Sequence, residues 1–155
     1  MAIGEEQMRI VKSTWKIVAA KAPTDTGAAI LLRLFEKYPH NQNYFAFRDV
    51  PLTSLKGSCL FRSHAGRIVE VFQHTIDAFD TPNAMTAIVD IWSDIARTHS
   101  SRMIKKQSYD ELKEVLLEVL TEMCKLDLEQ KTAWSVTLDT LFSIVSEKLL
   151  KLSSE

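Results

Sequence analysis

Two histidines lie within the hydrophobic stripes of two different predicted helices. His64 belongs to a stripe that runs from Phe61 to Phe79, and His99 closes a stripe that begins at Met85. Both stripes repeat at the steps of three and four residues that place side chains on one helix face. Imidazole fills a hydrophobic core poorly and is a good ligand for iron. Two inward-facing imidazoles on separate helices could therefore hold one iron from opposite sides.

A structural role is the alternative for each of these histidines. A single histidine on a hydrophobic helix face is more often a hydrogen-bonded core residue than a ligand. The other two histidines suggest no competing site: His40 lies in a Pro-His-Asn turn and is expected to be solvated, and His74 points about 280° away from His64 around the same helix. Cys59 and His64 have a zinc-like spacing, but no second pair of ligands follows them.

Composition narrows the function further. A chain of 155 residues with 46% hydrophobic and 25% charged residues is typical of one globular domain, here spanning 1–155. A formal net charge of −1 gives no electrostatic reason to expect nucleic acid or a membrane as partner. No hydrophobic run approaches the ~20 residues that cross a bilayer, and no signal segment opens the chain, so we expect a cytoplasmic protein. Cys59 and Cys124 fit a reducing compartment.

The pattern along the chain predicts an all-α fold. Only four glycines and four prolines interrupt it, and no long alternation of polar and hydrophobic residues suggests a strand. The segment 43–55 lacks helical periodicity and carries two phenylalanines, so we expect a loop that packs aromatic rings inward. Six substantial helices are expected, with a short turn of helix after Pro39; they cover 5–20, 24–38, 57–79, 82–99, a segment from 108 to about 123, and one from 127 to about 149.

Helix starts are expected where capping residues occur. Thr81 followed by Pro82 resembles a cap with proline at the first helical position. Ser108 with Glu111 has the spacing of a capping box, and Asp127 with Gln130 has a similar one. Residues 100–107 are polar and are expected to form a connection.

A flat ligand could lie between the two histidine-bearing helices, because they follow one another in the chain. Haem needs an axial imidazole, a hydrophobic wall, and cations for its propionates. Arg67 lies one turn after His64 and is the candidate for a propionate partner, with a solvated arginine as the alternative. The expected hydrophobic wall consists of Leu31, Phe35, Phe45, Phe61, Ile68, Ile95 and Leu112.

Several segments in this order resemble globins over essentially the whole chain. The run from Ile30 to Pro39 resembles the second helix of vertebrate myoglobins, and Phe45, six residues after that proline, matches the phenylalanine that stacks on haem. His64-Ala-Gly-Arg-Ile matches the distal histidine segment, and Ile95-Ala-Arg-Thr-His matches the proximal one. Trp15 fits the tryptophan usual in the first helix. The sequence around Phe-Ala-Phe-Arg-Asp-Val-Pro-Leu is most similar to that of intracellular haemoglobins of insects.

The resemblance implies a globin fold of six to eight helices around a haem pocket. It implies haem b bound without a covalent link, which agrees with the lack of a Cys-x-x-Cys-His motif. His99 would be the proximal iron ligand, and Thr98 matches a position where globins place a hydroxyl that orients the imidazole. The implied function is reversible oxygen binding for storage, transport or sensing, with O2, CO and NO as ligands.

The sequence leaves several alternatives open. His64 either lies beside the iron or binds it as a sixth ligand. The alternative function is that of a redox enzyme, such as a nitric oxide dioxygenase or nitrite reductase, or of an electron carrier, with a reductase as a further candidate partner. A third interpretation is a haem-free helical interaction module. Whether the chain is an enzyme is left undecided, and a monomer or weak homodimer is expected.

The chain also departs from the myoglobin pattern. His64 and His99 are separated by several more residues than in myoglobin, and the extra residues are expected to lengthen the corner near 77–85. The segment 100–107 does not align, so it predicts no propionate contact.

Overall fold

Helices account for all regular secondary structure in residues 2–154, which the computed structural model describes apart from the side chain of Ser101. The all-α prediction and its six substantial helices are confirmed. The α-helices are α1 (Glu5–Ala19), α2 (Pro23–Lys37), α3 (Cys59–Ala78), α4 (Ala84–His99), α5 (Lys106–Cys124) and α6 (Leu128–Ser153). The 3-10 helices are η1 (Pro39–Tyr44), η2 (Leu52–Gly57) and η3 (Ser100–Arg102).

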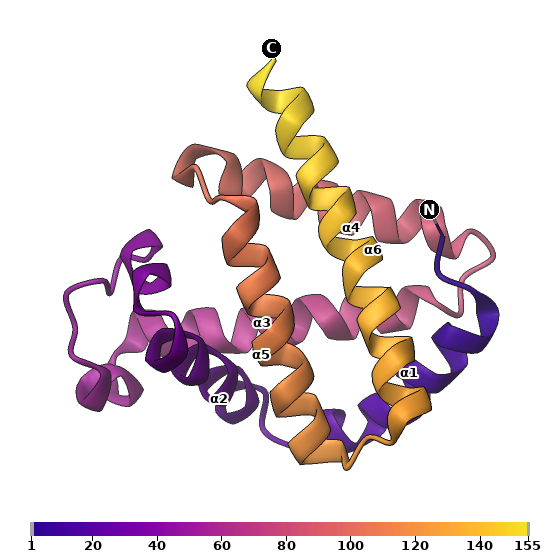
Figure 1. Cartoon of the computed structure of the whole chain (residues 1–155), viewed down its shortest axis with the longest axis horizontal. Coiled ribbons are helices and arrows are strands. Elements are labelled where there is room, and N and C mark those ends of the chain that lie inside the picture. The colour runs from indigo at the N-terminus through magenta and orange to yellow at the C-terminus, as the bar shows by residue number, and fades with distance from the viewer. Residues whose placement is uncertain (1, 155) are drawn as a thin grey trace.

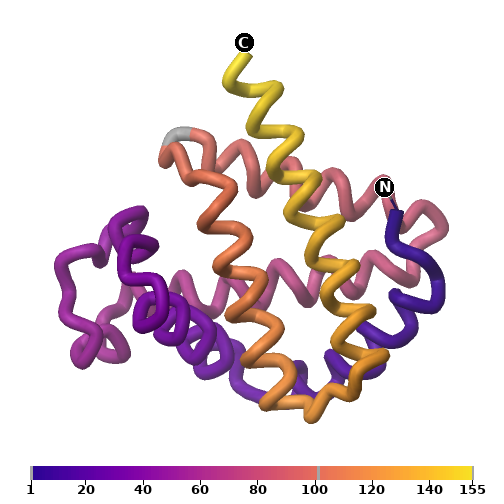
Figure 2. Tube along the Cα trace, in the orientation of Figure 1, coloured from indigo at the N-terminus to yellow at the C-terminus, as the bar shows by residue number. Residues whose placement is uncertain are grey.

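The helices form two crossed layers (Figure 1). α3 and α4 run in opposite directions in one layer, and α5 and α6 cross in front of them. α2 crosses α3 at one end, while α1 packs against α6 at the other. The last turns of α6 extend beyond the rest of the bundle, as the chain trace also shows (Figure 2). The two histidine-bearing helices are therefore neighbours in one layer.

α2 and α3 approach each other closely at a glycine. A Cβ atom added to Gly27 would lie 1.9 Å from the backbone oxygen of Ala65. No side chain can be accommodated at that distance, so the crossing requires glycine on α2. Because Ala65 directly follows His64, this crossing also determines the position of His64.

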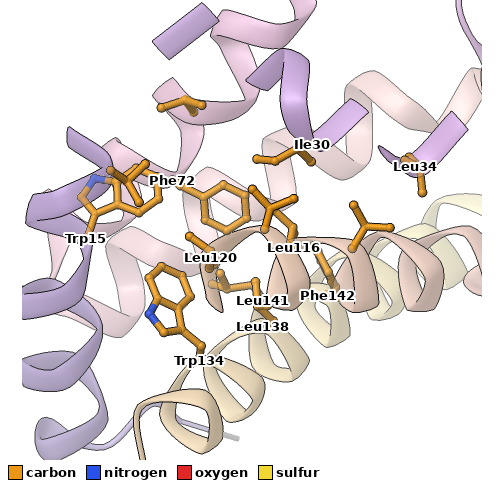
Figure 3. Close-up of a cluster of buried hydrophobic side chains, with 14 of the residues drawn as sticks. Trp15, Ile30, Leu34, Phe72, Leu116, Leu120, Trp134, Leu138, Leu141 and Phe142 are labelled. Atoms are coloured by element: carbon orange, nitrogen blue, oxygen red, sulfur yellow. The ribbon is translucent and has the colours of Figure 1, made fainter. Parts of the chain in front are cut away.

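Tryptophans anchor the core between the two layers (Figure 3). Trp134 on α6 is fully buried and donates its indole N–H to the Thr14 hydroxyl at 2.8 Å. Trp15 on α1 lies 6.0 Å from Trp134 between ring centroids and donates to Gln73 on α3 at 2.7 Å. Each indole thus buries a large hydrophobic area and keeps its polar group hydrogen-bonded.

One of the three predicted helix starts is confirmed. The Asp127 side chain accepts from the Gln130 N–H at 2.8 Å, as in a capping box. The prediction for Ser108 is wrong: the chain turns at Met103, which has a φ of 54°, and α5 already begins at Lys106. Ser108 therefore lies buried inside the first turn of α5.

The corner between α3 and α4 also differs from the sequence prediction. Thr81 does not cap α4; its hydroxyl donates to the Ala78 carbonyl at 2.7 Å and so closes the end of α3. α4 begins only at Ala84, after the N-cap residue Asn83. The corner itself is limited to residues 79–83, between the end of α3 and the start of α4.

Candidate functional site

α3 presents His64 toward an aromatic cluster. The helix is capped at its start by the Ser58 hydroxyl, which accepts from the Phe61 N–H at 3.4 Å. The ring centroids of His64 and Phe45 are 4.8 Å apart in an edge-to-face arrangement. Phe47 lies 6.5 Å from the same imidazole. The half-buried His64 ring is therefore held against hydrophobic rings, and no hydrogen-bond partner is recorded for it among the described residues.

α4 orients His99 through its own last turn. The Nδ1 atom of His99 lies 2.7 Å from the Ile95 carbonyl oxygen, which can only accept, so Nδ1 carries the proton. The Thr98 hydroxyl lies 3.0 Å from the same Nδ1 and itself donates to the Ile95 carbonyl at 2.9 Å. This tautomer leaves the Nε2 atom of His99 with a free lone pair. Such a hydrogen bond from Nδ1 to a backbone carbonyl or hydroxyl oxygen is typical of metal-binding histidines.

Both imidazoles are neutral near pH 7. Burial lowers the pKa of His64 to about 4, with further lowering by the nearby charges of Arg67, His99 and Arg102. Burial also lowers the pKa of His99, partly opposed by its hydrogen bond to Ile95. Only a neutral imidazole can donate a lone pair to a metal. The electrostatic effect of His99 on His64 agrees with the two rings facing a common space.

The predicted hydrophobic wall divides into two groups. Leu31, Phe35 and Phe61 are fully buried behind the histidines. The other four predicted wall residues pack against the core and stay only half-buried although they belong to hydrophobic stripes. Because these four come from α3, α4, α5 and the segment after η1, they outline a hydrophobic surface between the layers. They are Phe45, Ile68, Ile95 and Leu112.

This set of side chains fits haem. Two neutral imidazoles approach from different helices, hydrophobic side chains can flank a macrocycle, and cations are available for carboxylates. In the part of the chain that the structure describes, no cluster of three or more His, Cys, Asp or Glu side chains could hold a metal ion. Cys59, which has a zinc-like spacing from His64 in the sequence, is an exposed free thiol.

The cations near the site are arginines. Arg67 is exposed and close enough to lower the pKa of His64. Sequence reasoning missed Arg102, whose charge lowers the pKa of both His64 and His99. Arg102 lies in η3, within the segment that could not be aligned, so only its charge and its closeness to His99 in the sequence could have suggested it.

Phe47 is a second residue that was not singled out. Its ring is buried and stacks on Phe45 with centroids 4.9 Å apart, and it meets Phe61 edge-on at 5.5 Å. The prediction that the segment 43–55 packs aromatic rings inward is therefore confirmed, although the sequence did not distinguish the roles of the two rings. The segment is not a loop throughout, because residues 52–55 belong to η2.

The remaining histidines lie outside the site. His74 is exposed, as expected. His40 is exposed, as expected, and it also makes a structural contact, because its Nε2 atom lies 2.7 Å from the buried carboxylate of Glu111. Asn41 donates to the same carboxylate at 3.2 Å. This network ties η1 to α5 and explains how a glutamate can lie in the interior.

Comparison with known proteins agrees with this geometry. The family model named Globin matches residues 28–145. The chain belongs to the globin family. A solved structure named Drosophila melanogaster globin is 40% identical, with a TM-score of 0.88, and the match covers 93% of this chain and 94% of that one. The haemoglobin of the botfly Gasterophilus intestinalis is 32% identical, with a TM-score of 0.85, covering 94% and 97%.

A further structure of 40% identity is described as showing cyanide binding and haem cavity transitions in Drosophila melanogaster hexa-coordinate haemoglobin; its TM-score is 0.88 over 92% of each chain. Among curated proteins, globin CTT-VI of Chironomus thummi thummi is 29% identical over 90% of this chain and 84% of its own length. The resemblance to insect haemoglobins is thus confirmed. Globins bind haem b non-covalently, and haem b is the cofactor of this globin.

Proposed function

We propose that this globin binds oxygen reversibly, with His99 as the proximal iron ligand and His64 on the opposite side of the haem. The observation that carries the proposal is the hydrogen bonding of His99, whose Nδ1 proton is directed to the Ile95 carbonyl and the Thr98 hydroxyl. The Nε2 lone pair is then both free and fixed in direction. Haem supplies a ferrous iron that binds diatomic gases such as O2, CO and NO.

Other predicted residues complete the proposed site. Phe45, held edge-on to His64, and the half-buried Ile68 and Ile95 would flank the macrocycle. Leu31 and Phe61 support them from the buried side. The guanidinium group of Arg67 would pair with a propionate carboxylate, and Arg102 is a second cation suited to that role.

We propose further that His64 binds the iron when no external ligand is present. Its low pKa keeps the imidazole neutral, and no hydrogen bond recorded among the described residues would have to break for it to turn toward a metal. The hexa-coordinate Drosophila haemoglobin, at 40% identity, supports this arrangement by similarity. The N–H group of the same imidazole would also be able to donate a hydrogen bond to a gas held at this site.

Rapid mixing of the reduced protein with carbon monoxide tests this assignment. If His64 must first leave the iron, the observed rate reaches a plateau as carbon monoxide increases. An internal binding constant of ~100 would also weaken apparent affinity about a hundredfold, because only the open fraction reacts. A His64→Leu variant should remove the plateau and speed carbon monoxide binding.

The matched control is His74→Leu, which alters an exposed histidine on the same helix. It should leave the plateau and the visible spectrum unchanged. A linear dependence in the unmodified protein, with a single broad visible band for the reduced form, would contradict ligation by His64 but not oxygen binding. Unchanged oxygen and carbon monoxide kinetics in His64→Leu would contradict the placement of His64 beside the iron.

The cellular setting is a separate proposal. Both Cys59 and Cys124 are free thiols, which suits a reducing compartment such as the cytoplasm. No helix in residues 2–154 is long and hydrophobic enough to cross a membrane. We also propose a monomer or weak homodimer and, because the iron must stay ferrous to bind oxygen, a reductase as partner. Sedimentation of the purified protein and oxygen-binding assays with cell extract would test these points.

A further inference from the structure

A groove of about 530 Å³ lies on α3, bordered by the corner between α1 and α2. Its size falls within the range of small-molecule sites. Neither His64 nor His99 lines it. The charged residues of its lining are Lys21, Arg62, Arg67 and Glu70.

Three cations in this groove have no anionic partner among the described residues. No carboxylate in residues 2–154 lies within 4.0 Å of the charged groups of Lys21, Arg62 or Arg67, in contrast to most other arginines and several lysines of the chain. Glu70 is the single acidic residue in the lining. Its Oε1 atom lies 3.9 Å from the Nε2 atom of His74 on the same helix. The groove therefore carries an excess of positive charge in a protein whose formal net charge is −1.

The start of α2 adds to this positive potential. Its N-cap residue, Ala22, provides no side-chain cap, and Pro23 at the first helical position has no N–H. The Thr24 N–H therefore has no acceptor within the helix. Partial positive charge at a helix start favours anions. The hydroxyls of Thr24 and Ser63 line the same groove and can donate further hydrogen bonds.

We propose that this groove binds a small molecule that carries two or three phosphoryl groups. Lys21 and Arg62, the two groove cations that the proposed haem site does not use, suit two linked anionic groups better than one, and the concave shape suits a compact ligand. The low net charge of the chain argues against a flat membrane surface or nucleic acid as the main partner. A phosphoryl headgroup of a lipid shares this chemistry, so the experiment must separate the two sources.

Titration calorimetry of the haem-loaded protein with inorganic tripolyphosphate tests the proposal. Lys21→Gln and Arg62→Gln should each weaken binding about tenfold, the usual effect of losing one charge-assisted contact. Glu70→Gln should strengthen it, because it removes the only carboxylate in the lining. Affinity should also fall as salt rises. Arg67 is left unchanged, since it is also a candidate partner for a haem propionate.

Two controls make the outcome decisive. Lys131→Gln and Arg48→Gln remove the same charges from exposed positions outside the groove and should leave the tripolyphosphate affinity unchanged. Sedimentation with vesicles of phosphatidylcholine and phosphatidylinositol bisphosphate should show no binding. Absence of tripolyphosphate binding, equal losses in groove and control variants, or vesicle binding without tripolyphosphate binding would each overturn the proposal.

Discussion

His99 combines two properties that a core histidine does not need. Its Nδ1 atom is held by a backbone carbonyl at 2.7 Å and a hydroxyl at 3.0 Å from its own helix, and its Nε2 atom is left without a recorded partner in the part of the chain described. His99 is half-buried, and an imidazole with Nδ1 held by its own helix and Nε2 accessible has the arrangement that a metal ligand needs. At the scale of one residue, this asymmetry is the strongest sign of a ligand.

Replacing His99 with alanine should therefore release most of the haem. Haem binds the folded chain only, so its loss should also lower the melting temperature. The measurement is the Soret absorbance that remains after gel filtration, together with a thermal melt. His74→Ala serves as control, because that imidazole is exposed on α3. Full haem retention with an unchanged melting temperature in His99→Ala would refute the proximal assignment.

His64 should make the haem-free protein sensitive to acid. Its pKa is about 4 in the fold against an ordinary 6.5, so between these values the unfolded chain binds more protons than the folded one. Stability therefore rises with pH across this window and falls as pH drops from 6.5 toward 4. The contribution of His64 at pH 5 should be about 2 kcal/mol less favourable than at pH 8.

Urea unfolding at pH 8 and pH 5 measures this effect. Other groups also titrate in the window, His99 among them, so the quantity to compare is the pH dependence of the unmodified chain against that of His64→Leu. The variant should lose about 2 kcal/mol less between the two pH values. An equal loss in both proteins would show that His64 is not desolvated in the fold.

At the scale of elements, the crossing of α2 and α3 determines the position of His64. Gly27 lets the backbone of α2 touch the backbone of Ala65, one residue after His64. The neighbouring glycine, Gly66, has only ordinary contact with the Thr24 side chain, 3.5 Å from where a Cβ would lie. Of these two helical glycines, Gly27 therefore has no room for a methyl group, whereas Gly66 has.

Gly27→Ala should destabilise the protein by about 3 kcal/mol, because the new methyl group forces the helices apart. It should also change the carbon monoxide kinetics, since α3 carries His64. Gly66→Ala is the matched control and should be neutral or stabilise by up to about 1 kcal/mol, the gain in helix propensity. Urea unfolding and rapid mixing measure both. Equal stability of the two variants would contradict a tight crossing.

At the scale of the whole molecule, contacts distant in sequence join the helices into one unit. Arg33 on α2 donates to both carboxylate oxygens of Glu122 on α5, at 2.6 and 2.7 Å, and Lys37 pairs with Glu118 on the same two helices. Exposed pairs of this kind contribute at most about 1 kcal/mol each. The larger contribution comes from the shared core around Trp134, which joins α1, α3 and α6.

We therefore propose that residues 1–155 form one globin domain that unfolds in a single step. In the haem-free protein, urea transitions followed by circular dichroism and by tryptophan fluorescence should coincide. Tryptophans on α1, α4 and α6 report on both layers, so a partly unfolded state would separate the two curves. Separate midpoints would show that the chain contains more than one cooperative unit.

Local sequence determined the helices, the histidine positions and most of the hydrophobic wall. Each of these follows from a repeat of three and four residues or from a residue such as Asp127 that caps a helix through nearby atoms. Helix starts at Thr81 and Ser108 were predicted wrongly for a related reason. Their hydroxyls can serve more than one nearby group, and the turn at Met103 decided which backbone was available.

Only the tertiary structure decided which residues share a site. Arg102 lies near enough to lower the pKa of both histidines because η3 and its turn follow α4. The interior location of Glu111 depends on His40 and Asn41 from a distant segment. Gly27 of α2 likewise approaches Ala65 of α3, and the groove on α3 is lined by residues from both helices. Periodicity describes one helix at a time, whereas these features depend on the angle and distance between helices, which packing of the complete core determines.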